Sequence, residues 1–284
     1  MMKLSGKTKF LFFLLAGIAA GILICGYRPI FDYYAKTRLK QASEKAGFPV
    51  NISEIKTGRV IIALTLGQSN AANYGQTFYN PVHDVYFYYK GGIYRYKDPV
   101  PGASGKGSSV WGMLGDLLID KSVCDKAVFV SIAKGSSSVQ SWAEGECSLR
   151  LKETLKDLKR NNIKLTHIFW HQGEENNLYD TPPLLYKLGL GKVIEIIRGY
   201  GQDAPVFVSV ATYNPWARNR INRALRKAQA DFVKENNSVF SGPDTDSLVS
   251  HTDRFDGIHF SGSGMKKYSL LWLDAVLKSS KERK

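Results

Sequence analysis

The sequence is poor in cysteine and histidine, and it contains neither an internal repeat nor a low-complexity segment. Three of its 284 residues are cysteines and five are histidines. Hydrophobic residues make up 44% of the chain and charged residues 23%, which are ordinary values for a globular protein. A sizeable core is therefore feasible without disulfides or metals. Without a non-globular N-terminus, about 250 residues remain, which fits one α/β domain.

Only two cysteines, Cys124 and Cys147, lie beyond the N-terminal region. In an exported domain they could form a disulfide. Two unrelated buried thiols are the alternative, and the sequence leaves both open.

The N-terminal tail lacks acidic residues and precedes a long, uncharged and strongly apolar run. Lys3, Lys7 and Lys9 are followed by residues 10–27, which contain no charge and end at Arg28. A helix of this length spans about 27 Å, just enough to cross a bilayer core. The pattern predicts a transmembrane signal anchor at 10–27.

Two other N-terminal signals fit less well. Small residues at 19–21 could belong to a cleaved signal peptide, but the apolar run continues past them to Ile24. A lipoprotein modification of Cys25 would require a small preceding residue, and Ile24 is not small. We therefore favour an uncleaved anchor.

The anchor predicts a single-pass protein of the cytoplasmic membrane. Basic residues lie on both sides of the span, but long domains are translocated largely regardless of charge. We expect the tail inside and the main domain on the periplasmic or extracellular side. The predicted division is 1–28 for the tail and anchor, 29–58 for a stalk or linker, and 59–284 for the globular domain.

Strands and helices alternate along the globular domain. Expected strands lie at 59–66, 127–133, 165–170 and 205–211, a hairpin or irregular insertion at 83–96, and helices at 109–120, 148–161, 182–200, 216–236 and 265–277. This order predicts an α/β fold in which a mostly parallel sheet is covered on both faces by helices. In such folds ligands bind outside the carboxyl ends of the strands.

Polar residues follow the expected strands directly. They form the stretches "GQSN" (67–70), "KGSSSVQSW" (134–142) and "HQGEEN" (171–176), and "DGIHFS" (256–261) precedes the last helix. Each stretch alone could be a turn or a helix cap, because short motifs are weak signals. Their convergence on one edge of one sheet predicts a functional site.

The residue types in these stretches suit serine-dependent acyl transfer. Ser69 can be the nucleophile and His259 the base that takes its proton. Asp256, three residues before His259, can hold the imidazole in the correct tautomer and stabilise its cation. Glu174 could hold His259 instead of Asp256 or together with it, and we favour Asp256.

A tetrahedral oxyanion also needs hydrogen-bond donors that are fixed in advance. The backbone N–H groups of Ser69 and Gly135 and the side-chain amide of Gln172 would supply three. Glycine at 135 lets the backbone approach the substrate closely. Asn70 and Asn176 are expected to bind substrate or to support these loops.

Taken together, "GQSN", "WHQGE" and "DGIHFS" resemble the SGNH-hydrolase superfamily, specifically its sialate O-acetylesterase-like branch, carbohydrate esterase family six. The resemblance covers about residues 60–278. It implies a flavodoxin-like three-layer α/β/α sandwich that removes acetyl groups from sugars. By motif it assigns Ser69 as nucleophile and His259 as base, with Ser69, Gly135 and Gln172 in the oxyanion hole. The wider superfamily has Asn at the position of Gln172.

Other chemistries are disfavoured. His171 and Glu174 have the spacing of metal ligands on a helix, but no second His or Cys accompanies them, so no metal and no cofactor are expected. Lys106 in "GASGKGSS" is followed by Gly rather than Ser or Thr, which breaks the phosphate-loop pattern.

The net charge of +14 favours anionic partners. The basic helix at 218–227 is expected to be a solvated face that could also hold an anionic glycan, and nucleic-acid binding is not expected.

The sequence therefore predicts a membrane-anchored carbohydrate O-acetylesterase acting on an acetylated glycan outside the cytoplasmic membrane. A polysaccharide O-acetyltransferase could use the same Ser/His/Asp set, because the acceptor of the acyl group is not visible in the sequence. A glycan-binding module with a decayed site is disfavoured, since no expected polar group is missing.

Overall fold

The computed structural model describes residues 49–55 and 57–282. The predicted membrane span at 10–27 and most of the expected stalk at 29–58 lie outside these residues. No helix in the described part of the chain combines the length and the hydrophobicity needed to span a bilayer.

A single seven-stranded sheet forms the centre of the described domain. Its strands are β1 (Val60–Gly67), β2 (Val85–Tyr89), β3 (Gly92–Arg95), β4 (Lys126–Ser131), β5 (His167–His171), β6 (Val206–Val210) and β7 (Val239–Asp244). They follow the order β3-β2-β4-β1-β5-β6-β7. Only the β2–β3 hairpin pairs antiparallel, and every other neighbouring pair is parallel.

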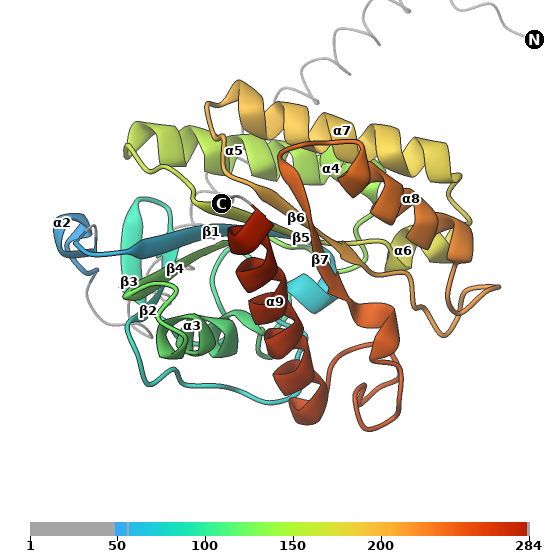
Figure 1. Cartoon of the computed structure of the whole chain (residues 1–284), viewed down its shortest axis with the longest axis horizontal. Helices are drawn as coiled ribbons and strands as arrows, with labels where there is room; N and C mark the ends of the chain where they lie inside the picture. Colours follow the sequence, from blue (N-terminus) through green and yellow to red (C-terminus); the bar gives the residue numbers. More distant parts are fainter. Residues whose placement is uncertain (1–48, 56, 283–284) are drawn as a thin grey trace, which may run out of the picture. The chain divides into compact units, whose positions relative to one another are not determined.

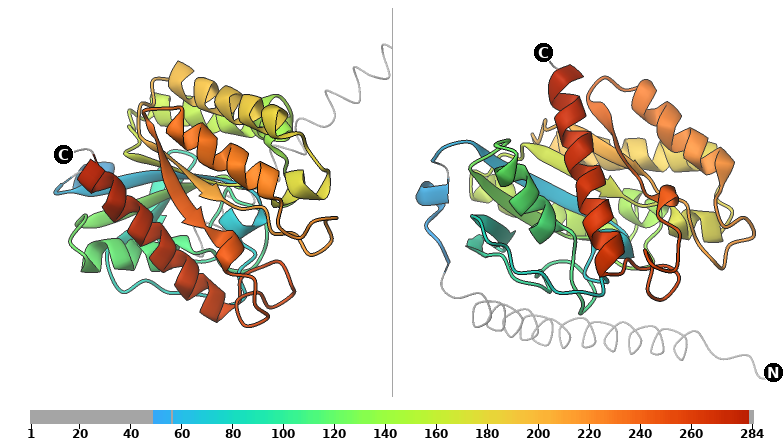
Figure 2. Two further views of the ribbon diagram at one scale, coloured as in Figure 1. Left: turned by 45° about the vertical axis from the view of Figure 1, so that its right-hand side comes forward. Right: turned by 60° about the horizontal axis from the view of Figure 1, so that its bottom comes forward.

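Helices cover both faces of the sheet (Figures 1 and 2). The first layer contains α3 (Trp111–Asp120) and α9 (Gly262–Glu282), which pack on each other. The second layer contains α4 (Val139–Ala143), α5 (Glu146–Arg160), α7 (Pro183–Gly199) and α8 (Arg223–Lys234). The remaining helical segments in the described residues are short. They are α2 (Ile52–Ile55), α6 (Glu174–Leu178), and the 3₁₀ turns η1 (Ser69–Ala71) and η2 (Thr245–Ser247). The predicted three-layer sandwich with a mostly parallel sheet is confirmed.

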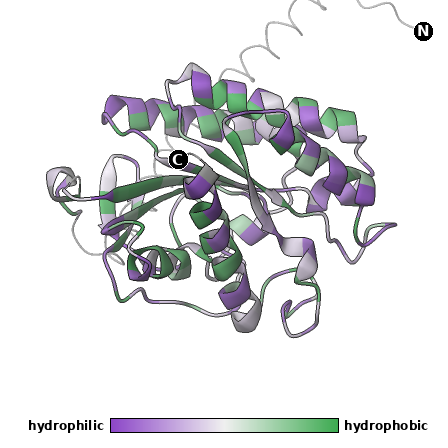
Figure 3. Ribbon diagram, viewed as in Figure 1, coloured by the Kyte–Doolittle hydropathy of each residue, from purple (hydrophilic) through white to green (hydrophobic). Residues whose placement is uncertain are grey.

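The two faces of the sheet carry different cores, because side chains along a strand alternate between faces. Leu64 and Trp170 belong to a mostly aliphatic cluster that includes Leu155 of α5. The opposite face is aromatic: the ring of Phe169 lies 5.7 Å from that of Trp111 and 4.7 Å from that of Trp272. Figure 3 shows the hydrophobic central strands beside helices that mix both residue types, as one-sided burial requires.

Cys124 and Cys147 are buried and are not joined by a disulfide. Burial raises the pKa of the Cys124 thiol to about 11 and raises that of Cys147 as well. Both cysteines therefore behave as core thiols, and the disulfide that the sequence left open does not form in this structure.

Candidate active site

The topology brings three of the predicted polar stretches to one edge of the sheet. β1 lies between β4 and β5 and is parallel to both. Gly67 at the end of β1 is in register with His171 at the end of β5, and its carbonyl accepts a hydrogen bond from Lys134 N, after β4, at 3.0 Å. The carboxyl ends of the central strands therefore meet where the ligand site of such a sheet is expected.

Ser69 follows β1 on a turn that only glycine permits. Gly67 has φ of +125°, and a Cβ at this position would lie 1.9 Å from the carbonyl oxygen of His171. Ser69 then begins η1 and is 5% exposed. Its hydroxyl makes no hydrogen bond within the described residues, so the oxygen is not committed to a structural contact.

Asp256 holds the ring of His259. Its Oδ2 lies 2.6 Å from Nδ1, and its Oδ1 accepts hydrogen bonds from the backbone N–H groups of His259 and Ile258 at 2.7 and 3.0 Å. Partial burial opposes ionisation of Asp256, but these hydrogen bonds outweigh it and lower the pKa of the carboxyl. An ionised Asp256 fixes the proton on Nδ1 and leaves Nε2 as the nitrogen that can accept one.

Asn70 connects the turn that carries Ser69 to the loop that carries His259. Its Nδ2 donates to the carbonyl oxygen of Ile258 at 3.2 Å, so the residue after Ser69 is bonded to the residue before His259. Ser69 Oγ and His259 are not hydrogen-bonded to each other here. Such contacts are often long without substrate and tighten when substrate binds.

Glu174 lies in a buried network behind this connection rather than against the ring of His259. Its Oε1 accepts from Asn70 Nδ2 at 2.9 Å and lies 3.0 Å from His171 Nε2. The Tyr268 hydroxyl lies 2.8 Å from His171 Nδ1. Burial would raise the pKa of Glu174, but the contacts with His171 and Asn70 and the nearby charge of Arg254 lower it overall.

Arg254 organises the loop that carries His259, although no sequence pattern singles it out. The guanidinium is buried between the rings of Tyr213 and Phe260, at 4.9 and 4.4 Å from their centroids. It donates to the carbonyl oxygens of Leu248 and Ile258 and to a third carbonyl in η2. These bonds fix the backbone immediately before His259.

Gln172 is fully buried, and its amide hydrogens are already engaged. Nε2 donates to Asn176 Oδ1 at 2.6 Å and to the carbonyl oxygen of Ser137 at 3.0 Å, with Gln68 Oε1 at 3.3 Å. Because an amide nitrogen carries two hydrogens, Gln172 can donate to an oxyanion only by exchanging one of these bonds. Its Oε1 has no partner in the described residues.

Asn176 and Gln68 support the same loop. Asn176 is fully buried and also donates from Nδ2 to Gln140 Oε1 at 2.9 Å, which ties α6 to α4. Gln68 Oε1 accepts from the backbone N–H groups of Gly173 and Glu175 at 3.2 and 3.1 Å. Asn176 therefore supports this loop from inside the fold and does not lie on a surface that substrate can reach.

Gly135 lies between two residues that the sequence did not single out. Its backbone N–H donates to Ser104 Oγ at 2.7 Å. A Cβ at 135 would come within 2.5 Å of the Tyr74 hydroxyl, which fills the space that a side chain would need. The ring of Tyr74 stacks on His259 at 5.0 Å and 22°. Tyr74 lies only five residues after Ser69, but a loop contact has no sequence periodicity that would reveal it.

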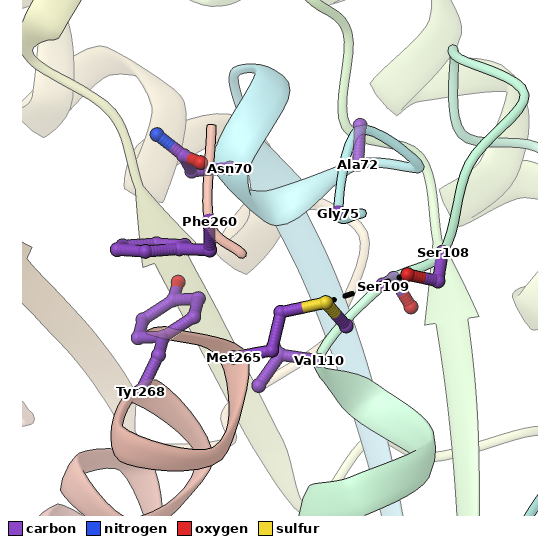
Figure 4. A pocket seen from close by; sticks show the side chains of 9 residues that line it. All are labelled: Asn70, Ala72, Gly75, Ser108, Ser109, Val110, Phe260, Met265 and Tyr268. Atoms are coloured by element: carbon purple, nitrogen blue, oxygen red, sulfur yellow. Dashed lines mark hydrogen bonds between the residues drawn. The ribbon is translucent and has the colours of Figure 1, made fainter. Parts of the chain in front are cut away.

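Asn70 is among the residues that line a cavity of about 10 Å³ (Figure 4). Phe260, Met265 and Tyr268 approach it from the C-terminal part of the chain. On the opposite wall, Ser108 Oγ donates to the sulfur of Met265 at 3.4 Å. The space is about that of one water molecule, so it separates packed elements and does not admit a substrate.

Asp98 anchors the segment that carries Ser104. Its carboxylate accepts from the Tyr96 hydroxyl and from Ser109 N, both at 3.0 Å. Burial nevertheless raises the pKa of Asp98 to about 7. The folded protein therefore keeps Asp98 protonated in a range where the unfolded chain has lost that proton.

We expect this carboxyl to make folding less favourable as the pH rises. The stabilising contribution is complete below the unfolded pKa near 3.8 and is lost as the pH approaches 7. A pKa difference of this size corresponds to roughly 4 kcal/mol as an upper value. Asp98→Asn cannot ionise, so its free energy of unfolding, relative to wild type, should be greater at pH 8 than at pH 5. Urea unfolding followed by tryptophan fluorescence measures this, and an equal difference at both pH values would contradict it.

Comparison with known protein families finds one family whose matched segment contains most residues of this site. Residues 112–278 match the family described as "Carbohydrate esterase, sialic acid-specific acetylesterase". The match begins in α3 and ends in α9, so it includes Gly135, Gln172 and His259 but not Ser69. A search among curated proteins finds no match.

In the described residues, no three His, Cys, Asp or Glu side chains gather where they could hold a metal ion.

Solved structures share the fold at low sequence identity. A protein from Arabidopsis thaliana is 15% identical, with a TM-score of 0.62 over 78% of this chain and 98% of that one. NanS is 15% identical, with a TM-score of 0.53 over 79% and 98% of the two chains. The family 3 carbohydrate esterase of Clostridium thermocellum is 14% identical, with a TM-score of 0.52 over the same shares. At these identities the likeness concerns the fold alone.

Proposed function

Because the chain belongs to the carbohydrate esterase family of sialic acid-specific acetylesterases, we propose that it is a serine-dependent O-acetylesterase that removes acetyl groups from a glycan outside the cytoplasmic membrane. Ser69 is the nucleophile, His259 the general base, and Asp256 the residue that orients the base.

In the first half-reaction, Ser69 Oγ attacks the carbonyl carbon of the acetyl group and His259 Nε2 takes the hydroxyl proton. The tetrahedral oxyanion is stabilised by hydrogen-bond donors at the strand ends, among them Ser69 N. When the intermediate collapses, His259 gives the proton to the departing sugar oxygen. The products are a free sugar hydroxyl and an acetyl ester on Ser69.

In the second half-reaction, water replaces the sugar. His259 Nε2 takes a proton from the water as its oxygen attacks the acetyl carbon, and it returns that proton to Ser69 Oγ. Acetate leaves and the enzyme is restored. Each proton passes through Nε2, which requires that Nδ1 stay bonded to Asp256.

The strongest support for this proposal is the way in which His259 is held. The ring of His259 is held by Asp256 at 2.6 Å, on a loop that Asn70, the neighbour of Ser69, binds at Ile258 O. A structural histidine at this place would not need an ionised partner on one nitrogen and an uncommitted second nitrogen.

An anionic glycan fits the charge near this edge of the sheet. Arg218, Arg220 and Arg223 are exposed on the loop and helix that follow β6. Asn177 of α6 donates to the carbonyl oxygens of Asn219 and Arg220 at 2.8 and 3.4 Å, which ties this basic loop to the helix that begins at Glu174. Guanidinium groups bind carboxylates with two parallel hydrogen bonds.

The location outside the membrane depends on the uncharged run at 10–27 and its basic N-terminal flank. A catalytic domain tethered there would meet acetylated envelope or exported glycans.

The decisive experiment compares acceptors. The full chain and Ser69→Ala are incubated with an aryl acetate and with acetylated polysaccharide, each with and without a glycan acceptor. Acetate release that needs Ser69 but no acceptor supports the esterase. Acetylated acceptor as the main product would instead identify an O-acetyltransferase. Equal turnover by wild type and Ser69→Ala would contradict both.

A further inference from the structure

The loop that carries His259 is a short hairpin in which Phe255 lies opposite the proposed general base. Arg254 and Phe260 form an antiparallel bridge, and the backbone N–H of Phe255 donates to the carbonyl oxygen of His259 at 3.0 Å. Side chains along an extended chain alternate between its two faces, and residues that lie opposite each other share a face. Phe255 and His259 therefore project from the same face of this hairpin, and their ring centroids lie 6.4 Å apart.

The two faces of the hairpin differ in burial. On one face, Arg254 and Phe260 are each 2% exposed, and the guanidinium lies over the ring of Phe260. On the other face, Phe255 is 46% exposed and the side chain of His259 is 19% exposed. The buried face anchors the hairpin to the domain. The ring of Phe255 is therefore presented to solvent on a fixed support and adds little to the core.

Two aromatic rings lie next to His259, and their surroundings differ. The ring of Tyr74 stacks on the imidazole at 5.0 Å, and a Cβ at Gly135 would lie 2.5 Å from the Tyr74 hydroxyl. Tyr74 is half-buried and is thus committed to packing between these two residues. Phe255 has nearly half of its surface exposed, so it is the ring with a face open to a ligand.

The exposed ring lies next to the position of the departing sugar in the proposed reaction. His259 Nε2 gives its proton to the sugar oxygen, so that oxygen must come within about 3.2 Å of Nε2. The sugar then lies beside the imidazole, on the exposed face that His259 shares with Phe255. Because a sugar ring is several bonds wide, it reaches from there to a ring whose centroid is 6.4 Å from the imidazole.

We propose that Phe255 is a specificity-determining residue whose exposed ring packs against the C–H face of the leaving sugar. This inference rests on the proposed function and deepens it, because it makes a pyranose a better leaving group than a small alcohol. Aromatic side chains combine a large contact area with a rigid ring, and a pyranose presents C–H groups on its faces. Phe255 transfers no proton and forms no covalent bond.

The test compares two acetyl esters that differ in the alcohol, fully acetylated methyl glucoside and ethyl acetate. Initial rates of acetate release by the full chain give kcat and KM for each ester. Phe255→Ala and Phe255→Leu remove the ring, and Phe255→Tyr keeps it. Leu270→Ala is the matched control, because Leu270 is 53% exposed on α9, about two turns beyond Gly262. Urea unfolding shows whether each variant is folded.

The quantity to compare is kcat/KM for the acetylated glucoside divided by kcat/KM for ethyl acetate. Phe255→Ala and Phe255→Leu should lower this ratio about tenfold, through a higher KM for the glucoside. Phe255→Tyr and Leu270→Ala should keep the wild-type ratio. A ring that only supported His259 would change both activities equally, because both esters need the same base, and the ratio would stay constant.

An unchanged ratio in Phe255→Ala and Phe255→Leu overturns this inference, whether both activities fall together or neither changes. Hydrolysis of ethyl acetate but not of the glucoside by the wild-type protein overturns it as well. These results leave the proposed esterase standing as long as acetate release depends on Ser69. Turnover that is independent of Ser69 would remove both proposals.

Discussion

Ser69→Ala is expected to lower kcat/KM for an aryl acetate by about 10⁴- to 10⁶-fold, the loss typical of removing a serine nucleophile. The reason is local. Gly67 turns the chain so that Ser69 begins η1 directly after β1, and the Ser69 hydroxyl is not used in the fold. Alanine therefore removes the proposed reacting oxygen and no hydrogen bond that the described residues make.

A measurement of stability distinguishes the loss of a nucleophile from a folding defect. Because the Ser69 hydroxyl has no hydrogen bond within the described residues, Ser69→Ala should unfold within about 0.5 kcal/mol of wild type. Ser280→Ala provides the control for the same chemical change at the far end of α9. Activity of Ser69→Ala within tenfold of wild type would show that another residue forms the acyl intermediate.

The sequence predicts the central strands well because their pattern is simple. A parallel strand buried on both faces is a short, nearly continuous run of apolar residues. The expected strand at 59–66 is observed as Val60–Gly67, and that at 205–211 as Val206–Val210. Once these strands are ordered, the convergence of the polar stretches follows from the topology. Membership of the esterase family confirms the resemblance that those stretches carried.

The prediction fails where tertiary contacts override local preference. The helix expected at 216–236 begins only at Arg223, where Asn222 caps it by accepting from Leu225 N at 3.0 Å. The preceding residues form a loop that is bound to Asn177 of α6. The sequence predicts no strand at Val239–Asp244, because Gly242 and Pro243 interrupt the apolar pattern. Such residues are tolerated there since β7 is an edge strand.

The supporting residues of the site were the least predictable part. Tyr74, Ser104 and Arg254 act through contacts between segments that lie far apart in sequence, such as Ser104 with Gly135 or Arg254 with Tyr213. A single sequence contains no signal for such pairs. It could name Asp256 and Glu174 as candidates for the partner of His259, and geometry was needed to place them.

The position of Asp256 against His259 leads to the second prediction with a large expected effect on activity. Asp256→Asn should lower kcat/KM by about 10⁴-fold, because an amide cannot fix the proton on His259 Nδ1 or stabilise the imidazolium. The hydrogen bonds of His259 lower the pKa of Asp256, so the carboxylate remains ionised across the neutral range. The defect should therefore be present at neutral pH, where initial rates with an aryl acetate measure it.

Glu174→Gln is the comparison that makes this result specific. Glu174 contacts His171 and Asn70, and its charge lies near the buried Arg254. Removing that charge should lower the free energy of unfolding by about 1–3 kcal/mol and reduce kcat/KM much less than Asp256→Asn does. Near-normal turnover of Asp256→Asn, with activity lost in a fully folded Glu174→Gln, would reverse the assignment. Glu174 would then be the residue that orients His259. Because Glu174 binds Asn70 rather than the ring of His259 in this structure, its contact with Asn70 would have to rearrange first.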